Sequence, residues 1–194
     1  MKLLLMLTMM MLCLSFSLSA QAASGKSKAI KAYKKMLSAS TMSWGSQGTK
    51  ISTSDVKFTL AYINKDSIPE LIVYAGANSH VAGAYAVYTW NKGRAVLLAN
   101  CRDGIAYYKK TGIFTTYTLL QGEYEIYYKI SKAKAVQQLS SYVGYVTSYK
   151  QGVEERSITE STYKEIARSI TKGKRAAKIK WRSNTGANRK KYLK

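Results

Sequence analysis

A few side chains in this sequence could support catalysis, and their spacing limits the chemistry available to them. His80 is the only histidine, and neither C-x-x-C nor H-E-x-x-H spacing occurs, which argues against a histidine-based zinc site. Cys101 and Asp103 could join His80 in a cysteine-nucleophile set, but no local motif supports it. We therefore predict that His80, which lies in a Gly-, Ala- and Ser-rich stretch, is a surface residue.

Two glutamates offer a second possible chemistry. Glu123 and Glu125 should lie on one face of a strand, about 7 Å apart, as a carboxylate pair for glycoside hydrolysis would require. With 31 basic and 10 acidic residues in the chain, however, each acid is more readily interpreted as the salt partner of a lysine. An enzyme should show a concave pocket that gathers two or more of His80, Cys101, Asp103, Glu123 and Glu125.

Residues 62–71, Y-I-N-K-D-S-I-P-E-L, resemble the D-x-N-x-D-G-x-P-E-L loop between two strands. That loop occurs in calcium-binding propeller-type repeats and in many uncharacterised secreted proteins of Gram-positive bacteria. Asn64, Asp66 and Glu70 match it, but a tyrosine holds the first carboxylate position and Ser67 holds the glycine position. Because the number of charged ligands sets calcium affinity, we expect a hairpin without an ion, and no metal or cofactor.

The resemblance extends more loosely over most of the chain. A lysine-rich helix, this loop, a tyrosine-rich meander and a final helix of the form I-[ST]-x-x-x-Y with a basic tail are similar to those secreted proteins. The resemblance implies a fold and a compartment, and it implies no activity.

The first 22 residues have the order of a signal peptide. Lys2 precedes an apolar run over residues 3–18, and Ala20-Gln21-Ala22 gives the A-x-A cleavage pattern. Cys13 lies inside the run, without the small residues that a lipidation site needs before its cysteine. We expect cleavage after residue 22 or 23 and one secreted domain over residues 23–194, with no transmembrane segment. Association with the cell wall is a further expectation. Its single cysteine, Cys101, excludes an internal disulfide and is expected to be buried.

The net charge of +21 points to polyanionic partners. The candidates outside a cell are anionic wall polymers, acidic glycans, anionic lipid headgroups and extracellular nucleic acid, and we expect a wall polymer or an acidic glycan. No specific nucleic-acid motif occurs, and the alternative is that the charge simply solvates the surface. The basic tail, residues 174–194, contains no acid, and we expect it to be mobile at its end. Truncation after Ser183 should then preserve folding and weaken retention on a polyanion. Its nine cationic residues are Lys174, Arg175, Lys178, Lys180, Arg182, Arg189, Lys190, Lys191 and Lys194.

The elements that position these residues can be read from periodicity. Amphipathic helices are predicted over residues 26–39 and 160–172, and a Ser-, Gly- and Thr-rich loop over 38–54. Predicted strands cover residues 57–63, 70–75, 84–90, 94–100, 105–109, 113–119, 124–130, 136–142 and 145–149. Their short connections predict an α+β fold with a curved, mostly antiparallel meander of seven to nine strands and both helices packed on it. A closed barrel or a propeller-like blade pair is the alternative.

The chain has 16 tyrosines, and those on the predicted strands are distributed over both faces. Tyr107 and Tyr108 should point in opposite directions, and so should Tyr127 and Tyr128. Such tyrosines are either packing residues of the sheet or, where exposed among lysines, a platform for sugar rings. Two functions remain open: a non-enzymatic module that binds polyanions, and a hydrolase of surface glycan or peptide.

Overall fold

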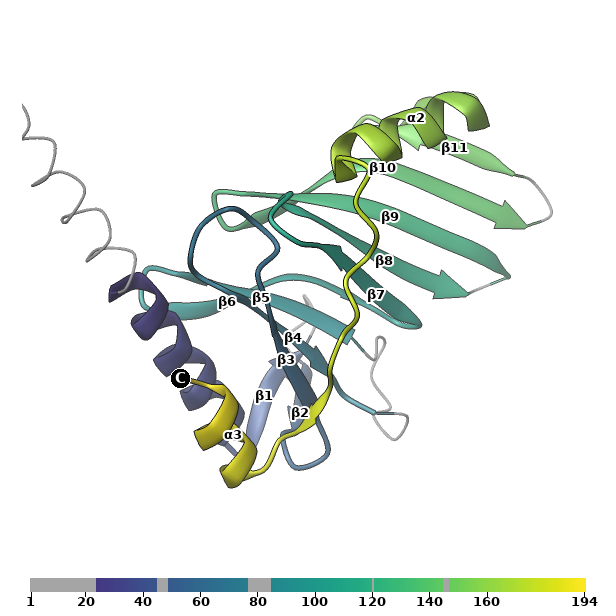
Figure 1. Cartoon of the computed structure of the whole chain (residues 1–194). Coiled ribbons are helices and arrows are strands. Elements are labelled where there is room, and N and C mark those ends of the chain that lie inside the picture. The colour runs from purple at the N-terminus through teal and green to yellow at the C-terminus, as the bar shows by residue number, and fades with distance from the viewer. Residues whose placement is uncertain (1–23, 45–48, 77–84, 120, 145–146) are drawn as a thin grey trace, which may run out of the picture.

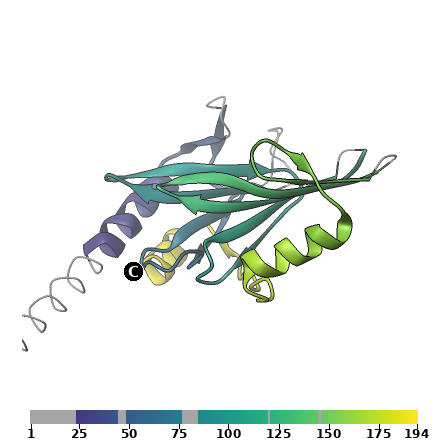
Figure 2. The ribbon, with the colours of Figure 1, turned by 90° about the horizontal axis from the view of Figure 1, so that it is seen from above.

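The computed structural model describes residues 24–44, 49–76, 85–119, 121–144 and 147–194. It has the predicted α+β class, with antiparallel sheets and helices near both ends of the described chain. The N-terminal helix (residues 24–38) and α2 (Glu160–Thr171) lie at opposite ends of the molecule (Figures 1 and 2). A short third helix, α3 (Gly186–Tyr192), lies beside the N-terminal helix.

The strands divide into two large sheets and one hairpin. The hairpin pairs β1 (Thr41–Trp44) with β2 (Thr49–Ser52). A five-stranded sheet has the order β13–β3–β4–β5–β6, formed by Arg182–Ser183, Lys57–Ala61, Glu70–Tyr74, Tyr85–Asn91 and Arg94–Cys101. A six-stranded sheet runs from β7 to β12 in chain order, formed by Gly104–Tyr108, Ile113–Leu119, Gly122–Ser131, Lys134–Gly144, Ser148–Gln151 and Arg156–Ser157. The meander therefore breaks once, between β6 and β7, and neither sheet closes on itself in the described chain.

Three hydrophobic clusters hold these layers together. The first joins the N-terminal helix, the β1–β2 hairpin and α3 to one face of the five-stranded sheet, with Tyr33, Trp44 and Leu193 buried in it. The second lies between the two sheets and includes Ile72 and Phe114. The third joins α2 to the other face of the six-stranded sheet. Each large sheet thus carries a helix on the face that points away from the other sheet.

Both predicted helices form, with the predicted apolar stripes. Tyr33 and its neighbours on the N-terminal helix are buried, and Tyr163 of α2 is buried against the six-stranded sheet. Thr159 caps α2 by accepting a hydrogen bond from the Thr162 N–H at 3.2 Å. Lys172 ends the helix in the left-handed conformation with φ of 58°.

The predicted loop over residues 38–54 is wrong, because β1 and β2 lie within it. Met42, Trp44 and Ile51 are buried there and alternate with exposed polar residues. Threonine and serine at the exposed positions gave the segment a loop-like composition, although threonine is a good strand residue. The apolar alternation is the signal for the hairpin.

The predicted opposition of neighbouring tyrosines is confirmed. Tyr107 packs between the sheets, whereas Tyr108 packs under α2. Tyr128 and Tyr127 divide in the same way. Most tyrosines therefore serve as packing residues on both faces of the sheet, and Tyr62 and Tyr124, each 36% exposed, are exceptions among the described residues.

Candidate functional site

The basic tail is folded over its whole length, contrary to the expected mobile end. From α2 it crosses the molecule, pairs with β3 through β13, and ends in α3 (Figure 1). The Ala177 N–H donates to the Tyr107 carbonyl at 2.8 Å, and Trp181 packs against the rings of Tyr74 and Tyr85. Leu193 is only 2% exposed because it fills the core beside the N-terminal helix.

A buried asparagine ties the tail to the rest of the chain. The Asn184 amide donates to the carbonyls of Leu37 and Thr53, both at 2.8 Å. Arg189 in turn donates to the Asn184 side-chain oxygen at 2.9 Å. This network fixes the last helix, so the tail is a structural part of the domain as well as a carrier of charge.

The structure divides the nine cationic tail residues into two groups. Arg189 serves in the network above, Lys174 donates to the Lys109 carbonyl at 2.8 Å, and Arg182 lies 4.6 Å from the centre of the Tyr192 ring. Lys191 lies 5.4 Å from the same ring. Lys174 and Lys191 are nevertheless exposed, as are the remaining five: Arg175, Lys178, Lys180, Lys190 and Lys194.

The fold adds lysines that the tail prediction did not include. Lys26, Lys31 and Lys34 of the N-terminal helix line a hollow of about 440 Å³ together with Lys194. The helix lysines are visible in the sequence as the polar face of the helix. Their approach to the last residue depends on the docking of α3, which no local sequence signal reveals.

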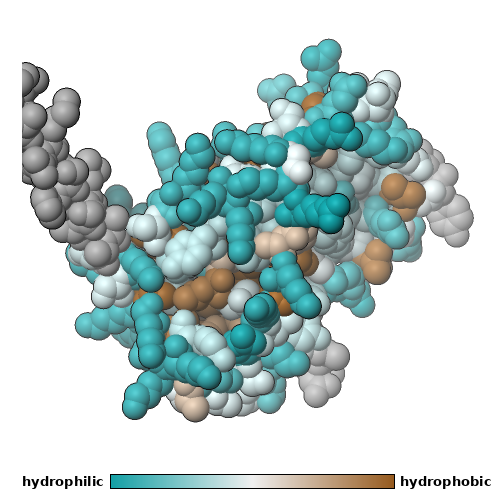
Figure 3. Space-filling model, viewed as in Figure 1, coloured by the Kyte–Doolittle hydropathy of each residue, from teal (hydrophilic) through white to brown (hydrophobic). Residues whose placement is uncertain are grey.

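Few of these charges are neutralised within the molecule. Among the residues that the structure describes, two ion pairs occur, Lys150–Glu155 at 2.6 Å and Lys164–Glu160 at 2.5 Å. All 30 cationic side chains after residue 22 lie in that part of the chain, so 28 of the 30 have no carboxylate within ion-pair distance. Long hydrophilic side chains cover most of the face in Figure 3, which also shows one hydrophobic strip. The interpretation of the acids as salt partners of lysine is therefore wrong for eight of the ten.

Three of the acids meet in one pocket at the end of the six-stranded sheet. The pocket, of about 410 Å³, lies across β7 to β10, and its lining includes Asp103, Ile105, Tyr117, Leu119, Glu123, Glu125, Ser141 and Val143. Strand register brings these side chains together. Tyr117, Glu125 and Ser141 form one cross-strand row, and Leu119, Glu123 and Val143 form the next.

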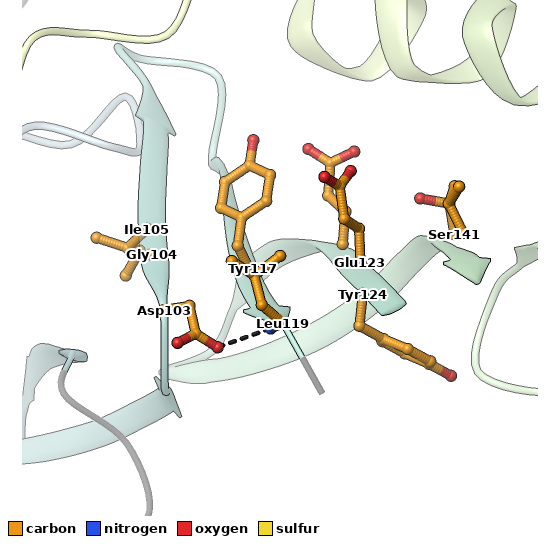
Figure 4. A pocket seen from close by; sticks show the side chains of 10 residues that line it. Asp103, Gly104, Ile105, Tyr117, Leu119, Glu123, Tyr124 and Ser141 are labelled. Atoms are coloured by element: carbon orange, nitrogen blue, oxygen red, sulfur yellow. Dashed lines mark hydrogen bonds between the residues drawn. The ribbon is translucent and has the colours of Figure 1, made fainter. Parts of the chain in front are cut away.

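The pocket side chains differ in how firmly they are held. The Tyr163 hydroxyl, from α2, donates to Glu125 at 2.7 Å, and the Leu119 N–H donates to Asp103 at 2.7 Å. Burial, with the Glu125 charge nearby, raises the pKa of Tyr163 above its ordinary value, so its hydroxyl remains a donor. Figure 4 shows Tyr117, Glu123 and Ser141 on one side of the sheet, and Tyr124 pointing to the other.

An enzyme should show a concave pocket that gathers two or more of the candidate residues. Asp103, Glu123 and Glu125 meet this condition, whereas Cys101 does not line the pocket. Cys101 is buried, its thiol donates to the Gly104 carbonyl at 2.8 Å, and burial raises the pKa of the thiol to about 11. A thiol with that pKa is protonated at neutral pH and is a poor nucleophile. His80 lies outside the described residues.

The calcium-like loop is closed by its own side chains. The carboxylate of Glu70 accepts hydrogen bonds from the Ile63 N–H at 3.1 Å and the Asn64 amide at 3.2 Å, and Asp66 accepts from the Ile68 N–H at 2.9 Å. No group of three or more His, Cys, Asp or Glu residues suited to a metal ion is found in the described chain. The Tyr33 hydroxyl also donates to the Pro69 carbonyl at 3.0 Å, which fixes the loop to the N-terminal helix.

Glu70 itself is 1% exposed, and burial is the main reason that its pKa is raised to about 8. Its hydrogen-bond donors favour the charged form, but they compensate only part of the lost hydration. Glu70 is therefore a structural carboxylate of the five-stranded sheet. Its ionisation, as the pH rises, destabilises the folded state.

Comparison with protein-family models, with curated proteins and with solved structures yields no significant match. The helices of the described residues include none that is both long enough and apolar enough to cross a bilayer.

Proposed function

We propose that the mature protein acts outside the cytoplasm as a non-enzymatic module that associates with anionic envelope polymers or acidic glycans. The observation that carries this proposal is the charge balance of the folded chain: 28 of 30 described cationic side chains have no carboxylate partner. Unpaired charges on one domain repel each other, and an anionic polymer removes that repulsion when it binds.

The order of the tail supports the proposal further. A folded tail holds its exposed lysines and arginines at fixed positions, so polymer binding does not require the entropic cost of ordering that segment. The hollow lined by Lys26, Lys31, Lys34 and Lys194 brings four lysines together and offers a site for an anionic group. The signal peptide predicted over residues 1–22 supports a location outside the cell, where such polymers occur.

Salt dependence provides the test. Binding of the mature protein to heparin and to poly(glycerol phosphate) is measured from low to physiological salt, where the Debye length falls to about 8 Å. We expect affinity to fall steeply, as it does when several cations displace condensed counterions. Absent or salt-insensitive binding to both polymers would refute the proposal.

A hydrolase of surface glycan or peptide is the second candidate function. One observation favours it, the pocket that gathers Asp103, Glu123 and Glu125. Release of soluble fragments from purified envelope polymer by the wild-type protein, lost in Glu123→Gln, would establish it. Failure of the wild-type protein to release fragments would exclude hydrolysis of the polymer tested.

A further inference from the structure

The pocket at the end of the six-stranded sheet lies where α2 leaves that sheet uncovered. α2 buries the cross-strand row that includes Tyr127 and Leu139. On the same face, the next two rows, around Glu125 and Glu123, line the pocket instead. Concave surface therefore remains at the end of a rigid, hydrogen-bonded sheet, which suits a preformed ligand site.

Apolar side chains are unusually exposed at this pocket. Five large hydrophobic side chains of the described residues are exposed, and two of them, Leu119 and Val143, point into this pocket. Leu119 is 61% exposed and Val143 is 44% exposed, on either side of Glu123 in the strand register. An apolar rim of this kind gains free energy when a ligand covers it.

The charge of the pocket has the opposite sign to that of the protein. Three carboxylates line it, and no lysine or arginine is among the residues that line it. Asp103 accepts a hydrogen bond from the Leu119 N–H, and Glu125 accepts one from the Tyr163 hydroxyl. Among the described residues, Glu123 has neither a hydrogen-bond nor an ion-pair partner. Because neighbouring like charges disfavour each other, the vacant acceptor sites favour a cationic group.

We propose that this pocket binds a ligand that carries a primary ammonium group on an apolar stem or ring. The ammonium group donates to Glu123 and Glu125, and the stem lies against Leu119, Val143 and the ring of Tyr117. The positive charge of the rest of the molecule opposes such a ligand only weakly, because charges beyond about 8 Å are screened at physiological salt. This binding is independent of the polyanion binding proposed above.

An alkyl diamine and an amino sugar both supply this chemistry, and the experiment separates them. The mature protein is titrated at physiological salt with 1,5-diaminopentane, with a glucosamine tetramer and with the N-acetylated tetramer, and binding is measured by calorimetry. We expect the diamine, the glucosamine tetramer or both to bind, and the neutral N-acetylated tetramer to bind at least about tenfold more weakly, since hydrogen bonds to charged groups are the stronger ones. Equal binding of both tetramers, or no binding of either amine, would overturn the proposal.

Glu123→Gln is the test variant, because Glu123 is exposed and its loss should not disturb folding. Glu154→Gln is the matched control, since Glu154 is also exposed and lies outside the pocket. The proposal predicts at least about tenfold weaker amine binding in the first variant and unchanged binding in the second. Equal effects of the two substitutions would show that only the net charge matters and would contradict the proposal.

Discussion

The two helix-covered ends of the molecule differ in how completely each helix covers its sheet. The N-terminal helix packs on β3 and β4, strands of five residues that span about 17 Å, with help from the β1–β2 hairpin and α3. α2 has 12 residues and is about 18 Å long, whereas β10 has 11 residues and spans about 36 Å. The covered end is a closed core with a cationic exterior, and the end that is only partly covered carries the acidic pocket.

At both ends a helix packs on the outer face of a sheet, yet one end presents a cationic exterior and the other an acidic pocket. Where the N-terminal helix, the β1–β2 hairpin and α3 together cover the sheet face, binding is left to the exterior, which is lysine-rich. Where the helix is shorter than the strands, cross-strand rows remain open, and polar side chains such as Glu123 and Ser141 occupy them. If the contacts described above set this difference, disrupting them at one end should leave the other end intact.

Truncation after Ser183 should have the largest effect, and it should damage the covered end. It removes Asn184, which bonds two carbonyls, and Leu193, which fills the core. This replaces the expectation, drawn from charge alone, that the truncated protein folds normally. We expect a loss of at least about 3 kcal/mol in the free energy of unfolding, measured by urea denaturation.

Two controls separate packing from charge in that truncation. Leu193→Ala keeps every charge and should cost about 2 to 4 kcal/mol. Deletion of Lys194 alone, an exposed residue, should leave the urea midpoint unchanged. A truncated protein as stable as the full chain would show that α3 does not hold the N-terminal helix in place.

Glu70 should make stability depend on pH. Its folded-state pKa of about 8 lies above the ordinary value of 4.5, so the folded state binds the proton more tightly than the unfolded state. Its stabilising contribution is therefore complete below pH 4.5 and is lost as the pH rises towards 8, by at most about 1.4 kcal/mol per pH unit. Asp66 and Tyr33 face the same group and do not change this sign.

The measurement is the free energy of unfolding at pH 5, 6.5 and 8 for wild type and for Glu70→Gln. The free energy of unfolding of wild type should fall, relative to that of Glu70→Gln, as the pH rises. A constant difference over this range would mean that Glu70 is ionised throughout and that burial does not dominate its titration.

Tyr163→Phe should have a smaller effect, at the end of the molecule where α2 lies. The substitution keeps the packing of the ring against Tyr127 and Tyr149 but removes the hydrogen bond to Glu125. We expect a loss of about 1 to 2 kcal/mol in unfolding free energy. The control is Tyr124→Phe, because Tyr124 is more exposed and points away from the pocket, and it should be nearly neutral. Equal effects of the two substitutions would contradict a specific role for the Tyr163 hydroxyl.

Local sequence pattern predicted most of the elements but not their long-range docking. The amphipathic helix over residues 160–172 and the alternation of Tyr127 and Tyr128 follow from residue spacing, and the structure confirms both. The docking of Leu193 and the bonds of Asn184 join residues more than 130 positions apart, so no local spacing contains them.

The candidate sites show the same division. Glu123 and Glu125 were recognisable as a pair on one strand, because alternation places them on one face. Their meeting with Asp103 and Tyr117 depends on the register of three neighbouring strands, which sequence spacing does not fix. The lysines of the tail and of the N-terminal helix are both recognisable from the sequence. Their meeting around one hollow depends on the docking of α3, which the sequence does not reveal.

Charge-matched variants test the central claim, that unpaired lysines at fixed positions hold an anionic polymer. Heparin affinity is measured for Lys31→Gln/Lys34→Gln/Lys194→Gln and for Lys129→Gln/Lys132→Gln/Lys134→Gln, which loses the same charge from exposed positions of β9, β10 and the turn between them. We predict that the first variant loses more affinity and more salt dependence than the second, because its lysines surround one hollow. Equal losses would contradict the claim, since they would mean that net charge alone, and not its placement by the fold, determines binding.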